Sequence, residues 1–352
     1  MKKNKRGKKK KKIKIIILLL FVALILANSI FLFLYNHFKT KDELKTCGDG
    51  TFYDTCSLRK PYFCKDGILI EMASLCGCPD GFQTSNNSCF SELYTSKKTV
   101  SLKYTFKGKP EEIKINVYGG INDYLSNLSR EIFFPNEKLI NRRDFKLKAI
   151  NNKLQRDSLS DLIVQIQNRE SKKEQQLRIA VSIVQNIPYN FSEKKELFEN
   201  KLINHSRYPY EVLYENSGTC SEKSLLLSAI LRELGYSVAI LYFPKENHEA
   251  VGVKCPLKRS IYETGYCFIE TSGPSIISDY NIIFSNGQTL SSKPEVYIIA
   301  EGIELPNDMK EYKDAKILNE IRSRSILGLI YSQKFDNLKK EYNLLEEEYK
   351  IE

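Results

Sequence analysis

The sequence of 352 residues has no tryptophan and only three histidines and three methionines. So few histidines leave few candidates for a general base, because imidazole most often fills that role. The sequence also has no glycine-rich nucleotide-binding loop and no aspartate-rich loop of the kind that binds calcium. We therefore predict no cofactor and no metal site.

Basic charge is plentiful but is confined to one end of the chain. The formal net charge is +11, and residues 1–14 contain ten lysines and arginines and no acidic residue, which leaves +1 for the rest. We therefore expect no nucleic-acid partner for the folded part of the chain. We interpret residues 1–14 as a cytoplasmic tail whose charge sets membrane orientation. Contact of this tail with nucleic acid or anionic lipid is the alternative.

Residues 15–35 are an uncharged and mostly apolar run. About 20 apolar residues in a helix span a bilayer. No small-residue cleavage site follows the run, which argues against a removed signal peptide. We predict a transmembrane signal anchor at 15–35 and a linker at 36–45. The chain would then be a single-pass membrane protein with a cytoplasmic N-terminus and its bulk outside the cytoplasm.

Residues 46–90 are rich in cysteine, glycine and proline. The six cysteines of this segment are Cys47, Cys56, Cys64, Cys76, Cys78 and Cys89. A segment this short buries little apolar surface, so we predict a module held by three disulfides of undecided pairing. A structural zinc site is the alternative. The module would bind a surface polymer or a protein partner, or serve as a spacer.

The remaining three cysteines differ in their surroundings. Cys255 and Cys267 flank a hairpin-like turn and are predicted to pair, which leaves Cys220 unpaired. Cys220 stands in Gly218-Thr219-Cys220, ahead of an apolar-periodic stretch over 225–234 that predicts a helix ending at Gly235. A thiol at a helix N-terminus is favoured as thiolate by the helix dipole.

A histidine and a carboxylate follow on predicted strands. The strands are expected over 237–243, 248–255 and 266–271, so that His248 opens the second and Glu270 lies on the third. An imidazole can accept the thiol proton and a carboxylate can orient the imidazole. Taken singly, a cysteine is more often a small buried hydrophobe. The other two histidines, His37 and His205, lie beside the apolar run and in a polar loop, where they suit the role of base less well.

These residues resemble the signature of the transglutaminase-like superfamily, relatives of the papain-like thiol enzymes. Gly218-Thr219-Cys220 and His248 match it, and Glu270 stands where the family usually has aspartate. The helix expected over 177–187 also fits, and the resemblance covers about 171–280. The tryptophan that often follows the histidine is absent. The resemblance implies an α+β fold in which a Cys-bearing helix packs on an antiparallel sheet, here assigned to residues 169–300.

Two further regions carry no recognisable chemistry. Residues 91–168 are predicted as an accessory region with a hairpin over 99–118 and helices over 123–130 and 147–166. Residues 301–352 are predicted to be helical. Their apolar seam is Tyr331, Phe335, Leu338, Tyr342, Leu345 and Tyr349. Docking of this seam on its own domain is expected, and a dimer contact is the alternative.

The expected function is that of a membrane-anchored extracytoplasmic thiol enzyme. Cys220 would attack an amide of a protein or peptide substrate, His248 would act as base and Glu270 would orient it. Water would then give hydrolysis and an amine would give cross-linking, which the sequence leaves open. The resemblance implies a side chain as second oxyanion donor, with Tyr210 or Tyr214 as candidates. The alternatives are a non-catalytic surface-binding or adhesion protein that uses the Cys-rich module, and an assembly scaffold built on the C-terminal helix.

Overall fold

The computed structural model describes residues 20–30, 45–130, 132, 141–198, 201–282, 289–323 and 328–344. The chain divides into two compact units, residues 1–45 and residues 46–352.

In the first unit, residues 20–30 form a helix. None of the helices that the structure describes is both long enough and apolar enough to cross a membrane. The described residues 20–30 cover about 16 Å at about 1.5 Å per residue, against about 30 Å for the apolar layer of a bilayer. The predicted transmembrane helix over 15–35 is therefore wrong. The predicted single-pass membrane localisation depended on this helix and is wrong as well. Residues 1–19 and 31–44, with the predicted tail and most of the linker, lie outside the described residues.

The second unit begins with the Cys-rich segment, which folds as two small sheets. The first has β1 (Thr55–Cys56), β2 (Tyr62–Lys65) and β3 (Ile68–Glu71), and the second has β4 (Gln83–Ser85) and β5 (Ser88–Phe90), with the one-turn α2 (Ala73–Cys76) between them. The disulfides are Cys47–Cys64, Cys56–Cys76 and Cys78–Cys89. All six cysteines are thus in disulfides, which leaves no thiolate here for the zinc alternative.

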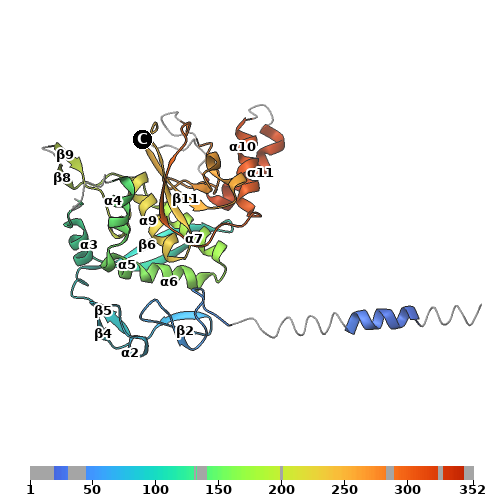
Figure 1. Ribbon diagram of the computed structural model, residues 1–352, viewed down its shortest axis with the longest axis horizontal. Coiled ribbons are helices and arrows are strands. Elements are labelled where there is room, and N and C mark those ends of the chain that lie inside the picture. Colours follow the sequence, from blue (N-terminus) through green and yellow to red (C-terminus); the bar gives the residue numbers. More distant parts are fainter. Residues whose placement is uncertain are drawn as a thin grey trace, which may run out of the picture. The chain divides into compact units, whose positions relative to one another are not determined.

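A four-stranded antiparallel sheet forms the centre of the second unit (Figure 1). Its strands stand in the order β12 (Tyr266–Ile269), β11 (His248–Lys254), β10 (Val238–Phe243) and β13 (Glu295–Ala300). The register of β10 on β11 pairs Phe243 with His248, so His248 lies at the end of the strand next to the turn. The predicted disulfide Cys255–Cys267 is formed beside the β11–β12 pair. Two 3₁₀ turns, η1 (Leu257–Arg259) and η2 (Ile261–Glu263), connect these two strands.

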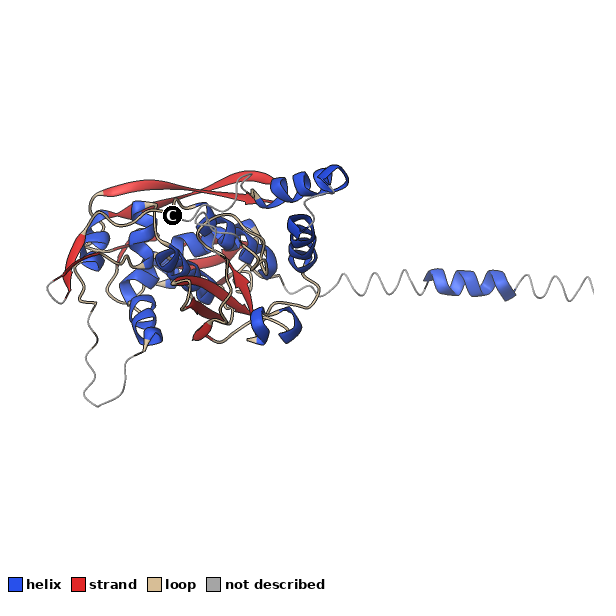
Figure 2. Cartoon of the chain, turned by 90° about the horizontal axis from the view of Figure 1, so that it is seen from above, coloured by secondary structure: helices blue, strands red, loops and turns tan. Residues whose placement is uncertain are grey.

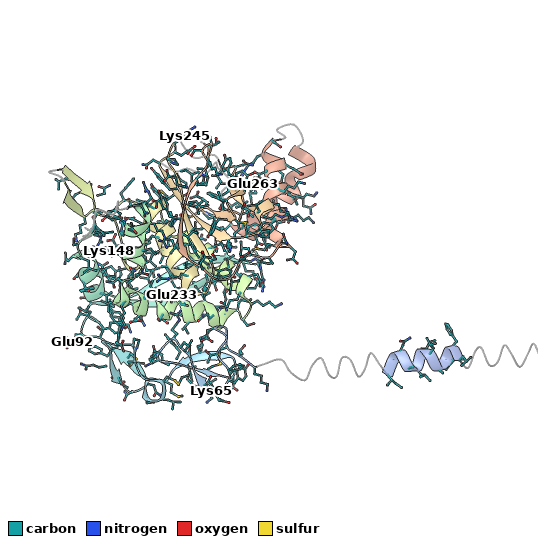
Figure 3. All side chains as sticks on the ribbon, in the orientation of Figure 1. Lys65, Glu92, Lys148, Glu233, Lys245 and Glu263 are labelled. Carbon is teal, nitrogen blue, oxygen red and sulfur yellow. A yellow bond between two sulfur atoms is a disulfide. The ribbon has the colours of Figure 1, made fainter. Side chains whose placement is uncertain are left out.

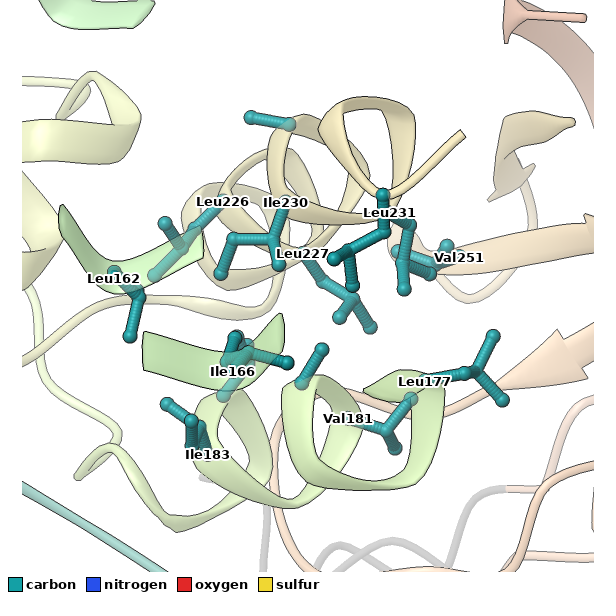
Figure 4. Packing of buried hydrophobic residues seen from close by; sticks show 14 of the residues in the cluster. Leu162, Ile166, Leu177, Val181, Ile183, Leu226, Leu227, Ile230, Leu231 and Val251 are labelled. Carbon is teal, nitrogen blue, oxygen red and sulfur yellow. The ribbon is translucent and has the colours of Figure 1, made fainter. Parts of the chain in front are cut away.

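One face of this sheet is covered by α9 (Cys220–Glu233), which packs on β10 and β11. Helix α9 also packs against α7 (Lys173–Asn186), and α7 lies next to α6 (Ser160–Arg169). Figure 4 shows the aliphatic side chains that fill the space between these helices and Val251 of the sheet. Leucine and isoleucine recur on the inner face of each helix, so burial of that face fixes the helices on the sheet.

The described residues of the predicted accessory region form a long hairpin and four helices. The hairpin pairs β6 (Lys97–Phe106) with β7 (Lys109–Tyr118) and forms the two longest strands in Figure 2. The helices are α3 (Gly119–Ser126), α4 (Arg142–Ile150), α5 (Lys153–Ser158) and α6. The single helix predicted over 147–166 is therefore wrong. Asn152 instead caps α5 by accepting a bond from the Gln155 N–H, and a capping side chain starts a new helix there.

The remaining described elements of the second unit are a hairpin and a helix that precede α9 in the chain, and two helices that follow the sheet. A hairpin of β8 (Lys195–Phe198) and β9 (Lys201–Asn204) precedes α8 (Pro209–Glu215). At the C-terminal end, α10 (Lys310–Ser323) and α11 (Gly328–Tyr342) pack together. Phe335, Leu338 and Tyr342 of the predicted seam belong to one apolar cluster that also includes Ala315 and Leu318 of α10. Leu345 and Tyr349 lie outside the described residues.

Candidate active site

Cys220 is the first residue of α9 and the only one of the nine cysteines outside a disulfide. The helix starts here because Thr219 and Glu222 form a capping box, in which each side chain accepts from the backbone N–H of the other. Glu222 is itself held by Arg207, which donates from Nη1 at 2.9 Å. Cys220 is partly exposed. Its thiol is therefore fixed at the positive end of the helix, on a residue that is only partly buried.

Gly218 brings the chain before Cys220 close to the end of α7. Its N–H donates to the Pro188 carbonyl at 3.1 Å, and its carbonyl accepts from the Asn190 N–H at 3.3 Å. A Cβ added at Gly218 would lie 3.2 Å from both Lys223 Cγ and Val212 Cγ1. Such contacts are tighter than ordinary packing, so a side chain at this position would push the segment away from α9. Glycine allows the close approach.

His248 and Glu270 form a buried hydrogen-bonded pair. The distance from His248 Nε2 to Glu270 Oε2 is 2.9 Å, and both side chains are almost wholly inaccessible to solvent. Cys220 lies close enough to His248 that a side-chain hydrogen bond between them contributes to raising the pKa of the imidazole. Since Nε2 is engaged by Glu270, Nδ1 is the ring nitrogen left to exchange a proton with the thiol. The three residues thus follow one another as thiol, imidazole and carboxylate.

The Glu270 carboxylate is held by the turn that follows it. Its Oε1 accepts from the Thr271 N–H at 2.9 Å, the Ser272 N–H at 2.8 Å and the Ser272 hydroxyl at 2.6 Å. Strand β12 ends at Ile269, so Glu270 lies just past the strand and not on it as predicted. Glutamate, one methylene longer than aspartate, thus reaches His248 Nε2 at 2.9 Å with Oε2, while its Oε1 is held by the turn.

Charges in the site favour an imidazolium next to a carboxylate. Burial lowers the pKa of His248, but the charge of Glu270 and the hydrogen bonds to Cys220 and Glu270 outweigh it and raise that pKa from 6.5 to about 10. Burial raises the pKa of Glu270, but His248 and the Ser272 donors outweigh it and lower that pKa from 4.5 to about 2. At neutral pH the pair is therefore an imidazolium and a carboxylate, and each charge stabilises the other.

The two tyrosines named as oxyanion donors lie toward the hairpin of β6 and β7. The buried Tyr210 accepts from the Tyr118 N–H at 2.7 Å through its hydroxyl. The ammonium of Lys98 sits 3.8 Å above the centre of the Tyr214 ring. Neither contact points to Cys220, and their role in binding an oxyanion stays a prediction.

The sequence analysis missed two residues of this site, Lys223 and Ser272. Lys223 is fully buried one turn after Cys220. The one sequence signal for this burial was that a lysine stands within a helix of otherwise apolar periodicity. Ser272 gave no signal, because its contact with Glu270 depends on the path of the turn. Within the described part of the chain, no group of three or more His, Cys, Asp or Glu side chains could hold a metal ion.

Comparison with known proteins supports the superfamily named above. No curated protein matches the chain. Residues 156–264 match the model of a family described as a transglutaminase-like domain. This segment includes Cys220 and His248 and ends before Glu270. The second unit therefore contains a region similar to transglutaminase-like domains, with α6 to η2 inside the match.

Proposed function

We propose that this site is a cysteine acyl-transfer centre that acts on an amide of a protein or peptide. One observation carries the proposal. The single unpaired cysteine starts a helix beside a buried histidine, and a carboxylate holds Nε2 of that histidine. Thiol, imidazole and carboxylate in this order are the parts of an activated thiol nucleophile. The match to a transglutaminase-like domain supports the same class.

The first half-reaction would form a thioester. The Cys220 thiolate attacks the carbonyl carbon, and the electron pair of the C=O bond moves onto oxygen. The backbone N–H of Cys220 is a suitable donor to this oxyanion, because the first N–H groups of a helix have no carbonyl partner within it. The C–N bond then breaks, and the leaving amine takes the proton from His248.

The second half-reaction would release the acyl group. Water or a primary amine attacks the thioester carbon while His248 accepts its proton. The C–S bond then breaks and Cys220 leaves as thiolate. Water gives a carboxylic acid and an amine gives a new amide. In both cases Glu270 keeps the imidazole oriented and stabilises it when protonated.

The test is alkylation of Cys220 by iodoacetamide in the full chain with its disulfides intact. We expect labelling to persist well below pH 8.5, the range in which an ordinary thiol is about half ionised. We also expect His248→Ala to suppress labelling at low pH. His205→Ala is the matched control, since His205 is a second buried histidine and should leave labelling unchanged. Labelling that follows an ordinary thiol would refute the proposal and leave the alternative of a non-catalytic scaffold.

A further inference from the structure

Lys223 is a buried cation that the mechanism above does not use. It lies on α9 three residues after Cys220 and has no exposed surface. Lysine is almost never fully buried unless its ammonium is paired. Its apolar stem lies against the Gly218 segment, where no Cβ is present to displace it. The glycine of the Gly-x-Cys sequence therefore makes room for this lysine.

The ammonium of Lys223 has three carbonyl acceptors. Its Nζ donates to the carbonyls of Ile187 at 2.6 Å, Ser272 at 3.1 Å and Gln185 at 3.3 Å. An ammonium has three protons, so the three acceptors match it fully. Two of these carbonyls belong to the end of α7 and the third to the turn after β12. Lys223 therefore ties both segments to the helix that carries the nucleophile.

The same two segments hold Glu270. Ser272 donates to Glu270 Oε1 from its N–H and its hydroxyl, at 2.8 and 2.6 Å. Gln185 of α7 donates from Nε2 to the Glu270 carbonyl at 2.9 Å. The backbone and the side chain of Glu270 thus depend on segments that Lys223 anchors.

The charges around Lys223 belong to the same site. Burial lowers the pKa of Lys223 to about 7, while the charges of Glu270 and Cys220 act in the opposite direction. Glu270 faces it from the turn after β12 and Cys220 from its own helix, and α7 contributes carbonyl oxygens. The charges of the site therefore favour the ammonium form of Lys223, and its burial opposes that form.

We propose that Lys223 is a positioning residue that fixes the 270–272 turn, so that Glu270 keeps His248 aligned with Cys220. The expected effect on the reactivity of Cys220 rests on the proposed function, because the alignment of His248 affects a reaction only if Cys220 is the nucleophile. Its geometric part concerns the Glu270–His248 pair alone and is measurable without a substrate.

The test compares Lys223→Met with Lys173→Met in the full, non-reduced chain. Lys173 is a matched control, because it is a half-buried lysine that donates to the Leu234 carbonyl just past the other end of α9. Two readouts are needed, the iodoacetamide labelling rate of Cys220 at pH 7 and the titration of the His248 ring by NMR. For Lys223→Met we expect labelling to fall more than tenfold and the His248 titration to move to lower pH. Lys173→Met should change neither.

The direction of the His248 titration separates positioning from charge. Loss of a nearby cation alone would move the titration to higher pH, whereas release of Glu270 moves it lower. A folded Lys223→Met protein whose titration is unchanged or higher would overturn the inference. Wild-type labelling like that of an ordinary thiol would refute the proposed function, and the titration would still decide the role of Lys223.

Ser272→Ala covers the case in which Lys223→Met does not fold. This variant removes one donor to Glu270 Oε1 and keeps the lysine and its carbonyl acceptors. We expect the same two shifts at smaller size. Unchanged labelling together with an unchanged His248 titration in Ser272→Ala would overturn the inference.

Discussion

The second unit contains two buried histidine–glutamate pairs, and they differ in their third partner. His248 Nε2 lies 2.9 Å from Glu270, and Cys220 interacts with the same imidazole ring. His205 Nε2 lies 2.6 Å from Glu211. In the second pair the added partner is a guanidinium: Arg130 donates to Glu211 at 2.9 Å and approaches His205 Nε2 at 3.2 Å.

This difference teaches that a buried His–Glu pair is not by itself a sign of catalysis. Glu211 also accepts from the Tyr208 N–H at 2.8 Å and so caps the start of α8. The His205 pair therefore ties a loop to a helix. The His248 pair is instead placed beside the one free thiol, where proton exchange has a chemical use.

The largest expected effect comes from removing the nucleophile. Cys220→Ala should abolish thioester formation and leave the fold intact, because Cys220 is partly exposed and its removal empties no large cavity. Mass spectrometry after incubation with an amide or activated-ester substrate would detect the acyl adduct in the wild type only. Unfolding of Cys220→Ala would show that the residue is part of the core.

Replacing each of the two histidines by asparagine should affect different properties, the reaction rate for His248 and the stability for His205. His248→Asn should slow alkylation and acyl transfer by a factor of about 10² to 10⁴, the usual contribution of a positioned base. His205→Asn should leave these rates unchanged and lower the free energy of unfolding by about 1–3 kcal/mol, because Glu211 loses a buried partner. Rate constants and denaturant unfolding of both variants make the comparison. Equal losses of rate would remove the distinction between the pairs.

Changing the carboxylates should produce a smaller effect on rate. Glu270→Gln should slow the reaction about 10- to 100-fold, since a charge-assisted hydrogen bond contributes about 1.5–3 kcal/mol. The amide can still accept from the Ser272 donors, so the fold should persist. Glu211→Gln is the control and should affect stability rather than rate. A Glu270→Gln enzyme as slow as His248→Asn would mean that the carboxylate does more than orient.

The smallest expected effect is on the pH dependence of stability. The pKa of His248 is raised from 6.5 to about 10, so its contribution is full below pH 6.5 and is lost as the pH rises toward 10. The pKa of Glu270 is lowered from 4.5 to about 2, so its contribution is full above pH 4.5 and is lost as the pH falls toward 2. Thermal unfolding of wild type and Glu270→Gln should therefore differ most between pH 4.5 and 6.5. A constant difference across pH would contradict the paired charges.

Local sequence patterns predicted the parts of the fold that depend on near neighbours. The hairpin of β6 and β7, the helix that starts at Cys220 and the strands around His248 follow from periodicity and from capping residues. Prediction was poorer where a boundary depends on one side chain, as at Asn152, where one expected helix became several. The hydropathy of 15–35 likewise predicted a span that the described helix over 20–30 does not provide.

The sequence by itself determined the chemical types and their order: a leftover cysteine, then a histidine, then a carboxylate. The sequence also favoured His248 over His37 and His205 as the base, but only the tertiary structure decided what holds the carboxylate and the imidazole in place. Glu233 illustrates the same limit at the other end of α9 (Figure 3), where Arg59 of the disulfide module reaches it at 3.2 Å across 174 residues. Such contacts arise when distant segments pack around one core, and no spacing along the chain encodes them. For the same reason the sequence shows Lys223 only as one more residue of a helix. The fold shows that it is a fully buried lysine one turn away from the nucleophile.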